Sequence, residues 1–168
     1  MKMNQTFQIK HATRAEVPLI LQLIRELADY ERAPDYAVAT EAQLDKVLFG
    51  ENPSAEVILA REGAEPVGFA VYFFNFSTWL GQPGLYLEDL FVRPAHRGKG
   101  YGRLLLARLA QIARERDCGR MEWAVLEWNE PAIEFYKKLG AKPMEDWTVF
   151  RLTSDGIGDL AESKSSYF

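Results

Sequence analysis

The stretch VRPAHRGKGYGRLLL, residues 92–106, joins an apolar strand pattern to a run of leucines. Its ten residues from Arg93 to Gly102 contain four basic side chains and three glycines. A strand followed by glycines and a helix is a general arrangement for holding phosphate, because glycines let backbone N–H groups approach the anion and the helix N-terminus adds partial positive charge. The stretch therefore predicts a strand, an anion-binding loop and a helix in succession. The alternative is a solvated turn whose basic residues have no such role.

The spacing of the glycines argues against two common nucleotide-binding motifs. A P-loop requires Gly-x-x-x-x-Gly-Lys-Ser/Thr, which the chain lacks. A dinucleotide-binding fingerprint requires Gly-x-Gly-x-x-Gly, and its two possible frames end at Arg103 and Leu105 instead of glycine. The pattern that remains is Arg97-x-x-Gly100-x-Gly102.

The composition of the whole chain limits the class of ligand. The 168 residues are 48% hydrophobic and 26% charged, which is typical of a globular protein. We expect a single domain over residues 1–168, with a core at about 6–153 and a C-terminal tail at 154–168. The net charge of -4 argues against binding of nucleic acid through bulk electrostatics. A basic loop on an acidic body indicates a small anionic ligand.

Cysteine usage and the N-terminal sequence indicate the cellular compartment and whether a metal cofactor is expected. The single cysteine, Cys118, has no partner for an internal disulfide and is expected to be a partly buried packing residue. No Cys/His cluster has the spacing of metal ligands, so we expect no metal cofactor. The first residues, MKMNQTFQIKHA, lack the apolar segment of a signal peptide, and no stretch approaches a membrane span. We therefore expect a cytoplasmic protein with no membrane partner.

The periodicity of apolar residues predicts a mixed α/β domain. Capping-box patterns at residues 13–16 and 40–43 mark the starts of two helices. Three strand patterns separated by turn-forming residues then predict an antiparallel meander. In chain order we expect a strand at 7–9, then the two helices, then strands at 55–61, 67–76 and 85–92. A helix follows from 101 until Asp117 stops it. The chain then continues with a strand at 121–126, a helix capped by Asn129 and a strand at 147–152.

The glycine loop and the order of elements resemble the GNAT family of N-acetyltransferases, whose pyrophosphate-binding motif is Arg/Gln-x-x-Gly-x-Gly/Ala. Further motifs are ELADYE at 26–31, LYLEDLFV at 85–92 and EWNEPAIEFYKKLGA at 127–141. Together with RGKGYG at 97–102 they resemble the branch of spermidine/spermine, diamine and thialysine acetyltransferases. The resemblance implies a single-domain GNAT fold, with a mixed central sheet of about six to seven strands flanked by about four helices.

The resemblance also implies an activity. An enzyme of this branch transfers an acetyl group from acetyl-CoA directly to a primary amine of a small basic acceptor, such as a polyamine, a diamine or a thialysine-like amino acid. The alternatives are an acetyltransferase for a protein N-terminus, an antibiotic or an amino-acid metabolite, and a non-catalytic acyl-CoA-binding sensor. A homodimer is implied by the resemblance alone, and the segment 164–168 is either a frayed tail or part of such an interface.

Acetyl transfer to an amine sets requirements that named residues could meet. An alkyl amine with a pKa near 10 is protonated at pH 7, so carboxylates are needed to attract the cation and remove its proton. Glu88 and Asp89 stand near the end of the strand that leads into the loop, and adjacent strand residues point to opposite faces, so at most one should line a given cleft. The resemblance favours Glu88 as the base, directly or through water. The alternative is that both are polar surface residues.

The resemblance assigns the remaining site residues. Tyr136 is the implied general acid, although a tyrosine at helical spacing with Ile133 and Leu139 is also a typical core residue. The implied cofactor-binding residues are Leu90, Phe91, Val92, Arg97, Gly98, Lys99, Gly100, Tyr101, Gly102, Arg103, Asn129, Glu130, Pro131, Ala132 and Tyr136. The implied acceptor-binding residues are Tyr30, Glu31, Glu88 and Glu145, of which Glu145 lies where this chain is a few residues shorter than the polyamine enzymes. His96 lies in the glycine loop, among the implied phosphate-binding residues, and is expected to be a solvated loop residue.

Overall fold

The computed structural model describes residues 6–163 and separates the chain into two compact units. The first unit is Met1–Ala124 and the second is Val125–Phe168. Each unit is described by itself below. The expectation of one domain over residues 1–168 stays a prediction, and the segment 164–168 lies outside the described residues.

A five-stranded mixed sheet forms the centre of the first unit. Its strands are β1 (Phe7–His11), β2 (Glu56–Glu62), β3 (Glu65–Ser77), β4 (Gln82–Val92) and β5 (Arg120–Trp123). They lie side by side in the order β1-β2-β3-β4-β5. The pairs from β1 to β4 are antiparallel, and β5 runs parallel to β4. The predicted meander and the mixed α/β class are therefore confirmed.

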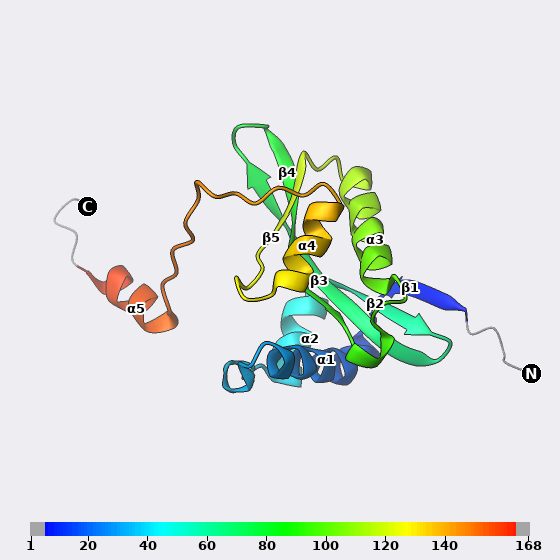
Figure 1. Cartoon of the computed structure of the whole chain (residues 1–168). Helices are drawn as coiled ribbons and strands as arrows, with labels where there is room; N and C mark the ends of the chain where they lie inside the picture. The colour runs from blue at the N-terminus through cyan, green and yellow to red at the C-terminus, as the bar shows by residue number, and fades with distance from the viewer. Residues whose placement is uncertain (1–5, 164–168) are drawn as a thin grey trace, which may run out of the picture. The chain divides into compact units, whose positions relative to one another are not determined.

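Helices cover both faces of this sheet (Figure 1). Helices α1 (Val17–Tyr30) and α2 (Glu41–Phe49) lie on one face, and α3 (Tyr101–Glu115) lies on the other. Short 3-10 turns at Arg14–Glu16, Pro34–Tyr36 and Pro94–His96 precede or connect these helices. The glycine loop thus lies between the end of β4 and the start of α3, as the sequence predicted.

The predicted capping boxes form at both expected positions. The Thr13 backbone N–H donates to Glu16 Oε2 at 2.8 Å, and the Thr40 N–H donates to Gln43 Oε1 at 2.9 Å. The Gln43 N–H in turn donates to Thr40 Oγ1 at 3.3 Å. These bonds satisfy N–H groups that have no carbonyl partner within the helix. Local sequence therefore fixes where the first elements begin.

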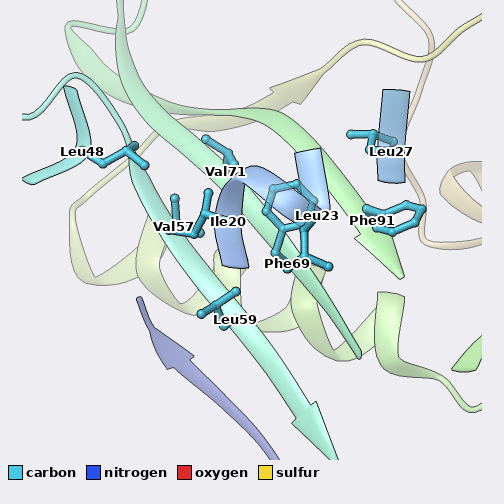
Figure 2. Close-up of a cluster of buried hydrophobic side chains, with 9 residues drawn as sticks. All are labelled: Ile20, Leu23, Leu27, Leu48, Val57, Leu59, Phe69, Val71 and Phe91. Atoms are coloured by element: carbon cyan, nitrogen blue, oxygen red, sulfur yellow. The ribbon is translucent and has the colours of Figure 1, made fainter. Parts of the chain in front are cut away.

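The core between the sheet and helices α1 and α2 is a cluster of nine apolar side chains (Figure 2). It consists of Ile20, Leu23, Leu27, Leu48, Val57, Leu59, Phe69, Val71 and Phe91. The members from the strands recur at every second position, as one face of a sheet requires. Complete burial of such a side chain contributes roughly 1.5–3 kcal/mol to folding. Tyr30 packs against the same cluster at the end of α1, so the core also positions a predicted site residue.

A register shift interrupts the pairing of β3 with β4. Val71 pairs with Asp89, but the next β3 residue, Tyr72, pairs with Leu87. Glu88 is therefore the extra residue of a β-bulge and has no partner in β3. Because of the bulge, Asp89 lies on the α1/α2 face with Val71, whereas Leu87 lies on the α3 face with Tyr72.

The second unit contains helices α4 (Glu130–Lys138) and α5 (Ser154–Glu162). The helix expected after Asn129 is confirmed, with Asn129 at the N-cap. The strand expected at 147–152 is wrong, because these residues form an extended coil. Val149 and Phe150 there are 83% and 92% exposed, and a strand needs a partner to bond its backbone.

Three further expectations need correction. Among residues 6–163 the sheet has five strands rather than six or seven, and there are five α-helices rather than four. The strand expected at 121–126 is Arg120–Trp123 and ends early. The expected tail at 154–168 begins with a helix. None of the helices in the described part of the chain is long and apolar enough to cross a membrane.

Helices α1, α3 and α4 end in the same backbone arrangement. The residue after each C-cap has a positive φ: Arg32 at 60°, Asp117 at 52° and Gly140 at 89°. The next N–H then donates to the carbonyl five residues earlier: Ala33 to Ala28 at 2.9 Å, Cys118 to Ala113 at 2.9 Å, and Ala141 to Tyr136 at 3.2 Å. These are Schellman motifs, in which glycine is the usual residue at the left-handed position.

Candidate active site

The glycine loop presents backbone groups at the start of α3. Gly98 and Gly100 have φ values of 77° and 84°, a conformation that costs glycine little. Gly100 is the N-cap of α3, so the N–H groups that follow it have no carbonyl partner within the helix. A Cβ at either glycine would meet nothing within 4 Å, so the surrounding space is open. The loop thus fits a phosphate-containing ligand by its backbone.

Arg93, the first basic residue of the loop, has a structural role. Its Nε donates to Glu26 Oε2 at 2.8 Å, and its second terminal nitrogen donates to Glu26 Oε1 at 2.7 Å. The remaining terminal nitrogen donates to the Pro66 carbonyl at 2.7 Å. The two-point contact lowers the pKa of Glu26 and raises that of Arg93. Arg93 therefore joins the end of β4 to α1, and its side chain is already paired within the protein.

Arg97 connects the loop to the C-terminal end of α1. Its Nε donates to the Val92 carbonyl at 2.9 Å. Its guanidinium carbon lies 4.1 Å from the centroid of the Tyr30 ring, within the range of a cation–π contact. The structure thus brings together two residues that the sequence assigned to different ligands, Arg97 to the cofactor and Tyr30 to the acceptor.

His96 and Lys99 contact carboxylates from the β2–β3 turn. His96 has a 12% exposed side chain that lies 3.3 Å from Glu62 Oε2 and 3.2 Å from Glu65 Oε1. Lys99 Nζ donates to Glu62 Oε2 at 2.8 Å. The expectation that His96 is a solvated loop residue is therefore wrong, since two carboxylates hold it against the sheet.

Three carboxyl groups lie near one another where α1 and the bulge of β4 meet. Asp89 has its pKa raised to about 6, first by burial and then by the negative charges of Glu88 and Glu31. Burial also raises the pKa of Glu31, which is the C-cap of α1. Glu88 is exposed. A carboxyl group whose pKa lies near neutral pH can accept a proton under physiological conditions.

Asp89 is a candidate site residue that was not assigned from the sequence. The strict alternation of strand side chains allowed only one of Glu88 and Asp89 at a given cleft, but the bulge breaks that alternation. A signal was present, because Asp89 stands in a strand where every other residue from Leu85 to Val92, apart from Tyr86 and Glu88, is aliphatic or phenylalanine. A carboxyl group in such a strand is expected to be partly buried and to have a perturbed pKa.

The backbone of β4 is open along one edge next to these carboxyl groups. Pairing of β4 with β5 ends at Leu87 and Trp123, while pairing with β3 continues to Val92. No strand in the described part of the chain pairs with the β5-side edge of residues 88–92. Leu90, Phe91 and Val92 were expected to contact the cofactor, and this edge could accept an extended ligand as an added strand. The Phe91 side chain itself is buried in the core.

The second unit holds the other predicted site residues. Asn129 caps α4, and Glu130, Pro131 and Ala132 form its first turn. Tyr136 is half-buried, with its ring centroid 5.5 Å from that of Phe135. Glu145 is exposed in the coil that follows α4. Their predicted roles in binding and catalysis stay predictions.

Two other expectations can be compared with the structure. Residues 6–163 contain no group of three His, Cys, Asp or Glu side chains that could hold a metal ion. Cys118 is partly exposed, and burial raises the pKa of its thiol, as a packing residue would show.

Comparison with known proteins gives a consistent result. The model of the acetyltransferase (GNAT) family matches residues 20–141. The thialysine N-epsilon-acetyltransferase of Sus scrofa is 36% identical over 164 residues, which cover 91% of this chain and 96% of that protein. The spermidine/spermine N(1)-acetyltransferase-like protein 1 of Homo sapiens is 38% identical over 165 residues, which cover 92% of this chain and 24% of that protein.

A solved structure extends the similarity to the fold. An integron cassette protein from the mobile metagenome of V. cholerae has a TM-score of 0.79 and 32% sequence identity to this chain. The match covers 96% of this chain and 99% of that one. The similarity therefore extends over almost the whole length of both chains.

Proposed function

The chain belongs to the GNAT family of acetyltransferases, and from this premise we propose that it transfers the acetyl group of acetyl-CoA directly to a primary amine of a small basic acceptor. Acceptors of this class include polyamines, diamines and thialysine-like amino acids. The observation that carries the proposal is the β4 bulge, which puts Glu88 and Asp89 next to the unpaired strand edge, with the charge of Glu31 close to Asp89.

The proposed donor site uses the loop and the open edge of β4. Acetyl-CoA, when bound, supplies the activated acetyl group as a thioester. The N–H groups at the start of α3 suit its phosphates, because they combine free donors with the positive end of the helix dipole. Leu90, Phe91 and Val92 provide the backbone edge along which an extended arm can bond. The proposed contacts with the donor also include Gly98, Lys99, Tyr101, Gly102 and Arg103, while Arg97 holds the end of β4.

The proposed acceptor site uses the three carboxyl groups in two ways. Their negative charge attracts an ammonium group, which is the main form of an alkyl amine at pH 7. One of them then removes a proton, because only the neutral amine is a nucleophile. Glu88 acts in this proposal as the base, directly or through water, and Asp89 shares the task because its pKa of about 6 lies near neutral pH. Tyr30 borders the site at the end of α1.

The second unit supplies the remaining proposed roles. Tyr136 is the proposed general acid that returns a proton to the departing thiolate. Asn129, Glu130, Pro131 and Ala132 are proposed donor contacts at the start of α4, and Glu145 is a proposed acceptor contact. The relatives named for thialysine and for spermidine/spermine support an acceptor with a primary amine and further positive charge.

A homodimer and a cytoplasmic location are also proposed. The second unit exposes several large apolar side chains, including Val149 at 83% and Phe150 at 92%. Exposed apolar groups of this kind favour association with another surface. Light scattering at several protein concentrations tests the dimer, and a monomer at all of them would refute it.

A thiol-release assay tests the function. The intact protein is given acetyl-CoA with each member of a panel: spermidine, spermine, 1,3-diaminopropane, thialysine, lysine, ornithine and a peptide with a free N-terminus. We expect release with one or more of the small amines, at a rate that rises as the amine loses its proton. Release with the peptide alone would contradict the proposed acceptor class. Binding of acetyl-CoA without release for any amine would instead support an acyl-CoA sensor.

A further inference from the structure

Two basic side chains of the glycine loop, His96 and Lys99, contact one carboxylate, Glu62, at the end of β2. Lys99 Nζ donates to Glu62 Oε2 at 2.8 Å, and His96 Nδ1 lies 3.3 Å from the same oxygen. Burial, followed by the nearby Glu62 carboxylate, raises the pKa of the Tyr101 hydroxyl. The Glu62 side chain is 20% exposed. One residue of the sheet therefore contacts the start and the middle of the loop, and its charge lies near Tyr101 at the start of α3.

Two further contacts fasten the same segment to the sheet. His96 Nε2 lies 3.2 Å from Glu65 Oε1, so the imidazole ring lies between carboxylates on both sides of the β2–β3 turn. The Tyr101 ring stacks on Phe7 of β1, with ring centroids 4.2 Å apart and an angle of 11° between the planes. The start of α3 is thus fixed from β1 and from β2.

The conformational freedom of the loop glycines explains why contacts that hold the loop should affect ligand binding. Gly98 and Gly100 make the left-handed turns possible, but glycine also has the largest conformational freedom to lose when a loop becomes ordered. A loop that is already held in its binding shape loses less entropy when a ligand arrives, and the ligand binds more tightly.

We propose that Glu62 is a positioning residue, which holds the glycine loop in the shape that receives the phosphates of the acetyl donor. The inference rests on the proposed use of acetyl-CoA. A carboxylate beside a phosphate site would by itself repel the ligand, so simple competition for Lys99 predicts the opposite effect. The positioning role is favoured because Glu62 also contacts His96, which two carboxylates hold at the start of the loop, while stacking on Phe7 fixes Tyr101 at its end.

The experiment compares two donors that differ in their phosphates. Acetyl-CoA carries the pyrophosphate, whereas S-acetylpantetheine carries the same thioester arm without any phosphate. Wild type, Glu62→Ala and Glu62→Gln are assayed with both donors and one amine that the wild type accepts. Binding of CoA is measured separately by calorimetry. Glu41→Gln, which removes an exposed carboxylate on α2, is the matched control.

We expect Glu62→Ala to weaken CoA binding by about three- to tenfold, the scale of partly exposed charged hydrogen bonds. The kcat/KM for acetyl-CoA should fall by the same factor, with kcat and the kcat/KM for S-acetylpantetheine unchanged. Glu62→Gln, which still accepts hydrogen bonds, should recover part of the loss, and Glu41→Gln should behave as wild type.

The other possible results would contradict either the Glu62 proposal or the proposed function. Tighter CoA binding by Glu62→Ala would overturn the proposal in favour of competition for Lys99. Unchanged CoA binding would also overturn it. Equal losses with both donors, accompanied by a lower melting temperature, would show a general structural role instead. Absence of CoA binding by the wild type would be a failure of the proposed function, and it is therefore distinguishable from a failure of the Glu62 proposal.

Discussion

Replacing Asp89 with asparagine should make the protein more stable at neutral pH and slow acetyl transfer. The pKa of Asp89 is raised from 3.8 to about 6, mainly by burial and then by Glu88 and Glu31. Between these two pH values the folded chain keeps a proton that the unfolded chain has released. The contribution of Asp89 to stability is therefore fully present below pH 3.8 and is lost as the pH rises through about 6.

The size of the effect follows from the difference between the two pKa values. The rise from 3.8 to about 6 corresponds to roughly 3 kcal/mol of destabilisation once the group is ionised in both states. Between pH 4.5 and pH 7.5 the wild type should lose roughly 2 kcal/mol of its free energy of unfolding through this residue. The Asp89→Asn protein has no such group and should not lose it.

Urea unfolding followed by tryptophan fluorescence at pH 4.5 and 7.5 measures this difference for wild type and variant. Asp45→Asn is the matched control, because Asp45 is an aspartate on α2 with a 42% exposed side chain, paired with Arg14. The control should change the pH dependence by less than about 0.5 kcal/mol. If the pH dependence of Asp89→Asn equals that of the wild type, Asp89 is not the raised carboxyl group and cannot share the proposed base role on this ground.

Other predictions concern rate, pH profile and a helix end. Glu88→Gln should lower the rate most near neutral pH. It also removes a negative charge that raises the pKa of Asp89, so the acid limb of the kcat/KM profile should move to lower pH. A pH profile equal to that of the wild type would exclude both effects. Tyr136→Phe should lower turnover with acetyl-CoA affinity nearly intact, and unchanged turnover would make Tyr136 a packing residue. Asp117→Gly should raise the free energy of unfolding by roughly 0.5 kcal/mol, because glycine suits the φ of 52° that ends α3; a less stable variant in urea would contradict this.

The local order of elements could be predicted because it depends on neighbouring residues. The capping boxes at Thr13 and Thr40, the alternation in the meander and the glycines before α3 each act over a few residues. The motif Arg97-x-x-Gly100-x-Gly102 also predicted the family that the comparison supports. These signals were sufficient for the class of fold and the class of reaction.

Long-range contacts could not be predicted in the same way. The strand expected at 147–152 had the right pattern, but a strand forms only where another strand pairs with it, and the pattern does not show the partner. Likewise, the four basic residues of the loop resembled one anion-binding group. The carboxylate partners of Arg93, His96 and Lys99 are more than 30 residues away in the sequence, at Glu26, Glu62 and Glu65. Arg97 instead contacts the Val92 carbonyl and the Tyr30 ring, so the four residues have different roles.

The sequence by itself determined the mixed α/β class and the glycine loop between a strand and a helix, because periodicity and turn chemistry are properties of adjacent residues. Only the tertiary structure decided which carboxyl group has a pKa near neutral and which basic side chains are already paired. The raised pKa of Asp89 depends on burial and on the charges of Glu88 and Glu31, next to a bulge in the β3–β4 register. The pairing of Lys99 depends on a carboxylate from β2. Burial and charge proximity arise only when distant segments pack together.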